Sequence, residues 1–192
     1  MAGTHLSRRI VLALGLLAAI GPFATDLYLP SFPLVSSDLE VAASEVQLTL
    51  TGFMIGMAVG QLFWGPISDR YRRRWPLLIA AVIFLAASVA TALSGNVEAL
   101  IASRVVQGVA ASVGMVVGRA IGRDLATGPA LARLFSLLAV IIRIALIVAP
   151  IFGGLLIGVV GWRGVLWAVA AFALAVLAIT AILVPETLPP RR

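Results

Sequence analysis

Six apolar stretches, each long enough to cross a lipid bilayer as a helix, dominate the sequence. Crossing about 30 Å of hydrocarbon takes about 20 helical residues at 1.5 Å per residue. Only 11% of the residues are charged, whereas about 25% are charged in soluble domains, so lipid is the solvent that suits this chain. We place the spans at about residues 10–30, 46–67, 75–94, 99–118, 133–160 and 164–184. The connections are short, so we expect residues 1–192 to form one all-α integral membrane unit of six transmembrane helices, with no soluble domain.

Positive charge is carried entirely by arginine, and its distribution predicts the orientation of the chain. The sequence has 14 arginines and no lysine. Loops that stay in the cytoplasm keep an excess of positive charge during insertion. Eleven of the arginines fall at the two ends of the chain or in alternate connections, whereas the opposite connections hold only Arg163. We therefore expect a multi-pass protein of the cell (inner) membrane with both termini in the cytoplasm.

Two other interpretations of the basic residues are less favoured. A strongly basic soluble chain would suggest nucleic acid as a partner, but in a membrane protein the Arg72-Arg73-Arg74 run is better explained as an anchor facing anionic lipid. Arg8 and Arg9 before the first apolar stretch imitate the start of a secretory signal peptide, but no A-x-A-like cleavage site follows. The expected partner is therefore the lipid bilayer and not nucleic acid.

Residues that carry enzyme chemistry are scarce. The chain has no cysteine and a single histidine, His5, in its N-terminal tail. The lack of cysteine excludes disulfides, thiolate metal sites and cysteine nucleophiles. No metal cluster, phosphate loop or nucleophile–base pair stands out, so we expect neither an enzyme nor a metal site.

Three charged residues lie inside the predicted spans and cannot be assigned to a loop; a charge there costs at least about 2.5 kcal/mol and usually faces a cavity or a partner. They are Asp26, Arg104 and Arg143. Asp26 lies about 6 Å and Arg104 about 9 Å from the outer face, so the two can share a cavity as a titratable pair. Alternatively, Arg104 only ties helices together and Asp26 is wet at the membrane surface. Arg143 lies near the midplane without an acid at matching depth, so it lines the cavity or meets a partner outside this chain.

Glycines at four-residue spacing form flat faces on two of the predicted helices. The second span contains Gly52, Gly56 and Gly60, and the fourth span and the residues after it contain Gly114, Gly118 and Gly122. Such faces let helix backbones approach closely. We therefore expect close helix packing there rather than direct contact with a substrate.

Five short motifs follow one another along almost the whole chain. They are Asp26-Leu27-Tyr28-Leu29-Pro30-Ser31-Phe32-Pro33, Gly65-Pro66-Ile67-Ser68-Asp69-Arg70-Tyr71-Arg72-Arg73-Arg74, Arg104-Val105-Val106-Gln107-Gly108, Ala149-Pro150-Ile151-Phe152-Gly153-Gly154 and Pro185-Glu186-Thr187-Leu188-Pro189-Pro190. In this order and spacing they resemble the motifs of the major facilitator superfamily and, within it, of the drug:proton antiporters of the Bcr/CflA type.

The resemblance implies a fold and a function. Proteins of this family have twelve helices in two six-helix bundles, each built of two inverted three-helix repeats. This chain would then be the N-terminal six-helix half, with its own 3+3 inverted repeat. The implied function is efflux of hydrophobic or cationic drug-like small molecules by proton antiport, with the proton gradient in place of any cofactor.

The resemblance also implies roles for individual residues. Asp26 would take part in proton and substrate coupling, and Arg104 would help to pass protons. A cytoplasmic gate would be formed by Asp69, Arg70, Arg73 and Arg123, and an antiporter hinge by Pro150, Gly153 and Gly154. Three positions depart from the family pattern: Arg72 replaces a glycine that allows a tight turn, Leu146 replaces a proline, and Arg143 stands where the residue is usually small or polar.

One bundle supplies only one wall of a cavity, so alternating access requires a second six-helix half. Three explanations stay open: a fragment of a longer product, a half-transporter that pairs with itself or with a sister chain, or a truncated reading frame. The chain ends at Arg191-Arg192, where the central linker of the family would begin, which favours the first or the third. The alternative function is therefore that of a truncated, non-transporting membrane protein, or of a half-transporter acting only as a dimer or scaffold.

Overall fold

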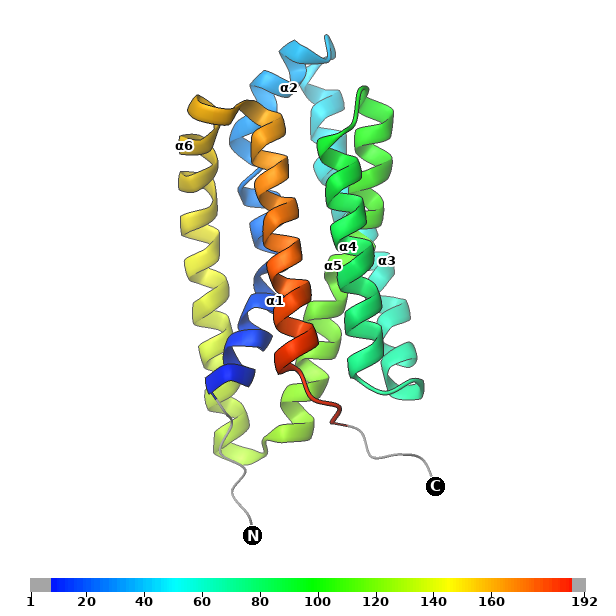
Figure 1. Ribbon diagram of the computed structural model, residues 1–192, viewed down its shortest axis with the longest axis vertical. Coiled ribbons are helices and arrows are strands. Elements are labelled where there is room, and N and C mark those ends of the chain that lie inside the picture. The colour runs from blue at the N-terminus through cyan, green and yellow to red at the C-terminus, as the bar shows by residue number, and fades with distance from the viewer. Residues whose placement is uncertain (1–7, 188–192) are drawn as a thin grey trace.

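The computed structural model describes residues 8–187, and within them every regular element is a helix. The elements are α1 (Arg8–Asp26), the 3₁₀ helix η1 (Leu29–Ser31), α2 (Phe32–Asp38), α3 (Ala43–Arg70), α4 (Arg74–Ala92), α5 (Val97–Leu125) and α6 (Gly128–Leu183). The long helices run side by side along the longest axis of the molecule, and the start of α1 and the end of α6 lie at the same end (Figure 1). His5, Arg191 and Arg192 lie outside the described residues.

Helix α6 is too long to cross a membrane once. As one straight helix, its 56 residues would extend about 84 Å. Gly161 interrupts it with φ 67° and ψ −178°, a backbone conformation that a residue without Cβ adopts readily. Residues 128–160 and 162–183 run as two antiparallel arms, joined where the chain turns back in Figure 1. Five continuous helical segments are long and apolar enough to cross a membrane, and α6 is one of them. The predicted number of six spans is reached when the two arms of α6 are counted separately.

The first predicted span, residues 10–30, is interrupted after Asp26. Helix α1 ends there, and the short helices η1 and α2 continue to Asp38. Pro30 and Pro33 lie in the first turns of η1 and α2, where the N–H group that proline lacks is not needed. The two prolines therefore divide the segment into one long helix and two short ones, and Asp26 lies at the boundary.

Close backbone contacts hold the long helices together. Gly56 on α3 faces the backbone of Val105 on α5, and Gly114 on α5 faces the backbone of Leu17 on α1. A Cβ atom added at either glycine would clash with the facing carbonyl oxygen. The flat glycine faces thus pack α3 against α5 and α5 against α1, as expected for small-residue faces in membrane helices.

Large apolar side chains cover much of the outer surface. Leu62, Val159 and Ile182 are 74%, 83% and 78% exposed. Such exposure would be unfavourable in water but matches a chain whose surroundings are lipid, because lipid tails are as apolar as leucine. The exposed apolar residues are consistent with a membrane location.

Candidate functional site

Asp26 borders a pocket of about 420 Å³ between α1, α3, α5 and α6. Three methionines, Met54, Met57 and Met115, contribute to its wall. The Thr25 hydroxyl donates a hydrogen bond to Asp26 Oδ1 at 3.4 Å, whereas the buried Oδ2 has no hydrogen-bond partner among the described residues. The carboxyl group therefore keeps one oxygen available for a proton or a ligand at the edge of an apolar pocket.

Arg104 on α5 is fully buried between two aromatic rings. Its guanidinium carbon lies 4.9 Å from the ring centre of Tyr28 and 4.6 Å from that of Phe53. Nη1 donates hydrogen bonds to the carbonyl oxygen of Ala24 at 3.0 Å and to Gln107 Oε1 at 2.7 Å. Cation–π contacts and hydrogen bonds to the charged group thus offset part of the cost of removing it from water.

The expected pair of Asp26 and Arg104 does not form. Arg104 bonds to Ala24 and Gln107 and is not among the residues that line the pocket beside Asp26. The depth estimate located both residues along the membrane normal, but depth does not fix the direction in which a side chain points. The interpretation that Arg104 ties helices together describes its contacts better, because they reach from α5 to α1 and α3.

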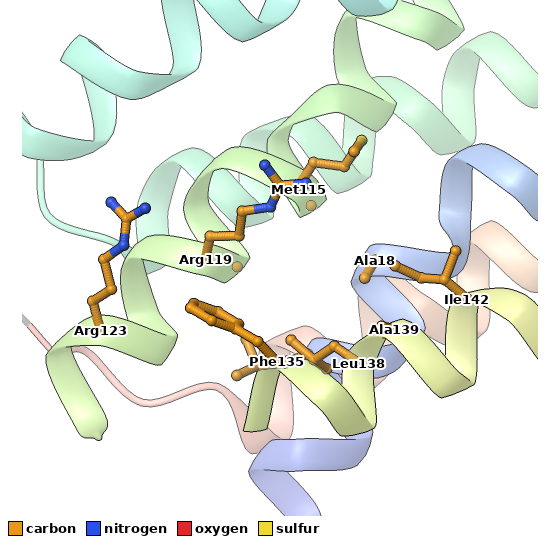
Figure 2. Close-up of a pocket in the computed structure, with 11 residues that line it drawn as sticks. Ala18, Met115, Arg119, Arg123, Phe135, Leu138, Ala139 and Ile142 are labelled. Atoms are coloured by element: carbon orange, nitrogen blue, oxygen red, sulfur yellow. The ribbon is translucent and has the colours of Figure 1, made fainter. Parts of the chain in front are cut away.

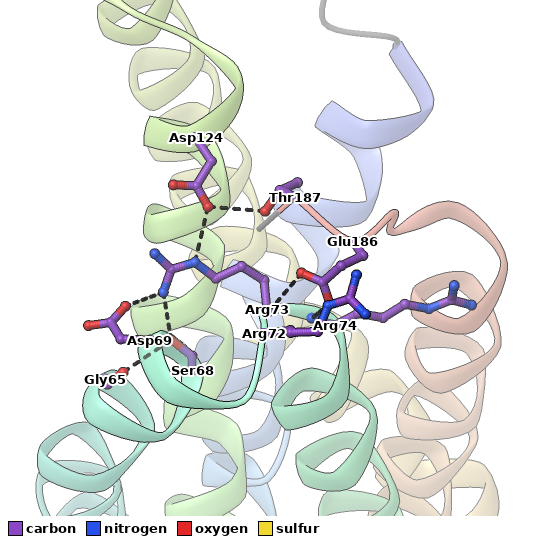
Figure 3. Close-up of polar contacts among 9 residues, drawn as sticks. All are labelled: Gly65, Ser68, Asp69, Arg72, Arg73, Arg74, Asp124, Glu186 and Thr187. Carbon is purple, nitrogen blue, oxygen red and sulfur yellow. Dashed lines mark hydrogen bonds and ion pairs between the residues drawn. The ribbon is translucent and has the colours of Figure 1, made fainter. Parts of the chain in front are cut away.

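Arg73, in the connection between α3 and α4, joins a polar cluster at the other end of the molecule (Figure 3). Its guanidinium donates to Ser68 Oγ at 2.9 Å, to Asp124 Oδ2 at 3.0 Å and also to Asp69 Oδ1. Asp124 Oδ2 accepts a further hydrogen bond, from the Thr187 hydroxyl at 3.0 Å. Burial disfavours the charge of Arg73, but the hydrogen bonds to Asp69 and Asp124 outweigh burial and raise its pKa above the ordinary value. Arg73 therefore stays charged and links the ends of α3 and α5.

The segment after α6 closes this cluster from a second side (Figure 3). The Glu186 carboxylate accepts hydrogen bonds from the backbone N–H groups of Arg73 at 3.0 Å and of Arg74 at 3.3 Å. One of its oxygens also lies 3.6 Å from Arg72 Nε. Free N–H groups at a helix N-terminus favour a negative charge, so Glu186 stabilises the start of α4 and ties it to the end of α6.

The sequence from residue 14 to residue 192 matches the profile of the Major Facilitator Superfamily. The chain belongs to this superfamily. It is 44% identical over 185 residues to an uncharacterized MFS-type transporter, YdgK, of Bacillus subtilis strain 168. This alignment covers 94% of this chain and 46% of the relative. It is 38% identical to a bicyclomycin resistance protein homolog of Haemophilus influenzae (92% and 44% covered) and 34% identical to the multidrug resistance protein D of Escherichia coli K12 (80% and 39% covered).

Solved structures of the superfamily show the same fold. The crystal structure of a D-xylose-proton symporter superposes with a TM-score of 0.81 at 19% identity, covering 93% of this chain and 48% of that one. An inward-facing, occupied bacterial homolog of the lysosomal transporter Spinster gives a TM-score of 0.81 at 18% identity, with 93% and 44% covered. The chain therefore spans less than half the length of the relatives and structures that it matches.

The family assignment confirms the resemblance seen in the five motifs, including the resemblance to drug-resistance transporters. It also identifies a multi-pass membrane protein of a transporter family rather than an enzyme. The cytoplasmic gate that the motifs imply stays a prediction, but the structure shows which of its four residues meet. Asp69 and Arg73 bond directly, and Arg123 borders a small pocket together with both, whereas the guanidinium of Arg70 lies over the ring of Tyr71, 5.5 Å from its centre.

Sequence reasoning missed three members of the cluster around Arg73. Glu186 and Thr187 belong to the motif that ends the chain, but nothing in that motif indicated which residues it would meet. Asp124 directly follows the predicted gate residue Arg123, and it carries the carboxylate that Arg73 bonds. The sequence did indicate the turn at Arg72, because the motif that this segment resembles has glycine at that position. The structure gives Arg72 a φ of 73°, a conformation that costs a residue with a side chain roughly 1 to 2 kcal/mol.

The predicted hinge lies beside α1. Gly153 on α6 packs against the backbone of Leu27, where an added Cβ would clash with a carbonyl oxygen, whereas a Cβ at Gly154 would meet open space. Pro150 lies one turn earlier, inside α6. Gly153 therefore marks the point at which α6 touches the residue that follows Asp26.

The two other departures from the family pattern lie on the same arm of α6. Leu146 lines the pocket beside Asp26. Arg143 is exposed and makes no hydrogen bond or ion pair with a described residue. Its predicted role as a cavity charge or as a contact for a second half stays a prediction.

An ion pair at the end of the molecule opposite the cluster around Arg73 (Figure 1) was also missed. Arg163, at the turn of α6, donates to Asp38 Oδ2 at 2.6 Å, and Trp162 Nε1 donates to the same oxygen at 3.2 Å. The hydrogen bond from Arg163 is the main cause that lowers the pKa of Asp38 below its ordinary value. The pair joins α2 to the turn between the two arms of α6.

Proposed function

We propose that this chain supplies one half of a multidrug efflux transporter of the inner membrane, driven by proton antiport, with both termini in the cytoplasm. The observation that carries this proposal is the unpartnered Oδ2 of Asp26 at the edge of the methionine-lined pocket. The names of two relatives, a bicyclomycin resistance protein homolog and a multidrug resistance protein, support efflux of drug-like molecules.

The chemistry of the pocket suits such a substrate. Methionine side chains are flexible and polarizable, so a wall containing Met54, Met57 and Met115 can adapt to apolar molecules of different shapes. Asp26 is the acid at this pocket. A proton on Asp26 and a substrate group that needs its carboxylate exclude each other, and this competition exchanges one for the other.

In the proposed half-transporter, each of the two arms of α6 crosses the membrane as a separate span. This gives six spans with a 3+3 arrangement, as in one half of the superfamily fold. The second wall of the cavity is supplied by a C-terminal half or by a second copy of this chain. Crosslinking of the purified chain separates these alternatives, because a dimer is expected only if a second copy supplies the wall.

The proposal is tested in cells that express the complete transporter, this chain together with its second half. Asp26→Asn keeps the size of the side chain but removes the titratable group, so drug resistance should fall to the level of cells without the transporter. Glu40→Gln, which removes an exposed acid outside the pocket, should leave resistance intact. Unchanged resistance in Asp26→Asn at normal expression would overturn the role of Asp26.

A further inference from the structure

A second pocket, of about 240 Å³, lies between α1, α5 and α6 toward the end of the molecule that holds Arg73. Its walls are mostly apolar, with Leu14 from α1 and Phe135 and Leu138 from α6. Arg119 and Arg123 stand on the α5 side, and Figure 2 shows Arg119 running along α5 toward Met115, across the pocket from Phe135. The pocket thus combines an apolar interior with two cationic groups.

These two arginines differ from Arg73 and Arg74, which lie at the same end of the molecule. Arg73 and Arg74 are held by Asp69, Asp124 or a backbone carbonyl. Arg119 and Arg123 are exposed and have no hydrogen bond or ion pair with a described residue. They are four residues apart on α5, which places them on one helix face about 6 Å apart along the axis.

The pocket adjoins the one beside Asp26. Ala18, Met115 and Ile142 line both, so the two pockets share a wall formed by α1, α5 and α6. A molecule that carries only positive charge would be repelled by the two arginines. A molecule with an anionic group would be attracted there.

We propose that the transported molecule is an amphiphile that carries an anionic group, such as a carboxylate or a sulfonate, at one end. Arg119 and Arg123 receive this group while the apolar body lies against Phe135 and Leu138. The group that competes with the proton on Asp26 belongs to the other end of the molecule. The inference rests on the proposed transport function, because it assigns the pocket to the substrate path. Arginine suits this role because the N–H donors of its planar guanidinium group can bond two oxygens of a carboxylate or a sulfonate, and the guanidinium stays charged. The wall shared with the pocket beside Asp26 favours a transported molecule over a membrane lipid as the occupant.

The test uses two fluorescent probes that share one aromatic body. The first, 8-anilinonaphthalene-1-sulfonate, carries a sulfonate, and the second, N-phenyl-1-naphthylamine, has no charge. Binding of each is titrated to the full chain in phosphatidylcholine nanodiscs and corrected for empty discs. Loss of one charge-assisted hydrogen bond typically weakens binding about tenfold, so Arg119→Gln and Arg123→Gln should each raise the Kd of the sulfonate by about tenfold.

Two controls separate this site from general effects of charge and folding. Arg133→Gln removes an arginine that lies near the same end but does not line the pocket, and it should change the Kd of the sulfonate by less than about twofold. The uncharged probe should bind all the variants with a Kd within about twofold of the unmodified chain, which also shows that the pocket is intact. Equal weakening in Arg133→Gln, equal loss of both probes, or an unchanged Kd in Arg119→Gln and Arg123→Gln would each overturn the inference.

A third arm tests whether a lipid fills the site instead. The sulfonate titration is repeated in discs in which part of the phosphatidylcholine is replaced by anionic phosphatidylglycerol. An unchanged Kd is expected, whereas a large rise that disappears in Arg119→Gln would assign the pocket to lipid and overturn the inference. Because binding is measured without transport, the proposed function fails separately, through unchanged resistance in Asp26→Asn.

Discussion

Gly108 on α5 lies directly against the backbone carbonyl of Phe53 on α3, so that a Cβ atom at position 108 would clash with it. The contact matters for more than packing, because the ring of Phe53 is one of the two that enclose the guanidinium of Arg104. Arg104 lies one turn before Gly108 on the same helix. The close approach of α3 and α5 therefore brings the aromatic ring to the buried charge.

We expect Gly108→Ala to destabilise the protein. The added methyl group must push α3 and α5 apart, and overpacking of this kind costs about 1 to 3 kcal/mol. Thermal unfolding of the purified chain in detergent should show a lower midpoint. Gly158→Ala is the matched control, because a Cβ at that position on α6 meets open space. A midpoint for Gly108→Ala equal to that of Gly158→Ala would contradict the close contact.

Removal of the Glu186 carboxylate should loosen the start of α4. In Glu186→Gln the side chain keeps its size but loses the charge that accepts hydrogen bonds from Arg73 and Arg74. Loss of such a contact at a helix N-terminus typically costs about 1 kcal/mol, so amide hydrogen exchange should become faster in the connection between α3 and α4. The exposed Glu40, replaced by Gln, should leave exchange in this connection unchanged. Equal protection in both variants would show that Glu186 does not hold the connection.

The arrangement of helices was largely predictable, and the exceptions have local causes. The length of an apolar stretch fixes whether it can cross a bilayer, and the polar break at Gly161-Trp162-Arg163 correctly separated two predicted spans that the structure joins in one bent element. Hydropathy did not reveal that α1 ends at Asp26, because the residues up to Pro30 are still apolar. The prolines decide the end of the helix there, through missing hydrogen-bond donors rather than polarity.

The partners of the charged residues could not be predicted in the same way. Residue type and depth singled out Asp26 and Arg104, but a pairing depends on side-chain direction, which the sequence pattern leaves open. Arg73 meets an acid 51 residues away on α5 and another 113 residues away after α6. Such contacts follow from how the helices pack, and a single sequence carries no direct signal of that packing.

The ion pair between Asp38 and Arg163 predicts a pH dependence at the acidic end. The hydrogen bond from Arg163 lowers the pKa of Asp38 in the folded protein, so its contribution to stability is present at neutral pH and is lost as the pH falls through the lowered pKa, starting near the ordinary value of about 4. Asp38→Asn should therefore lower the unfolding midpoint at pH 7, and the difference from the unmodified chain should shrink as the pH falls below the ordinary pKa of about 4. Since the pair is partly exposed, salt should shrink the effect as well.

Glu40→Gln provides the reference for this measurement, because Glu40 is an exposed acid in the same connection. It should unfold at nearly the same temperature as the unmodified chain across the whole pH range. A difference between Asp38→Asn and the unmodified chain that stayed constant as the pH fell through the acidic range would exclude the carboxylate charge as its cause.

Arg104 distinguishes a structural anchor from a group that passes protons. Its contacts with Tyr28, Phe53, Ala24 and Gln107 are those of an anchor, so Arg104→Ala should lower the unfolding midpoint by leaving a cavity and losing buried hydrogen bonds. If Arg104 also passes protons, Arg104→Ala should abolish drug-induced proton release from the complete, detergent-solubilised transporter.

The comparison with Tyr28→Phe separates these two roles. This variant removes the hydroxyl that meets Thr49 but keeps the aromatic ring beside the guanidinium, so it lowers stability without removing the charge. If Arg104 passes protons, proton release should persist in Tyr28→Phe and disappear in Arg104→Ala at temperatures where both variants are folded. Normal release from folded Arg104→Ala would leave Arg104 with a structural role alone, and proton exchange would then depend on Asp26 without help from the buried arginine.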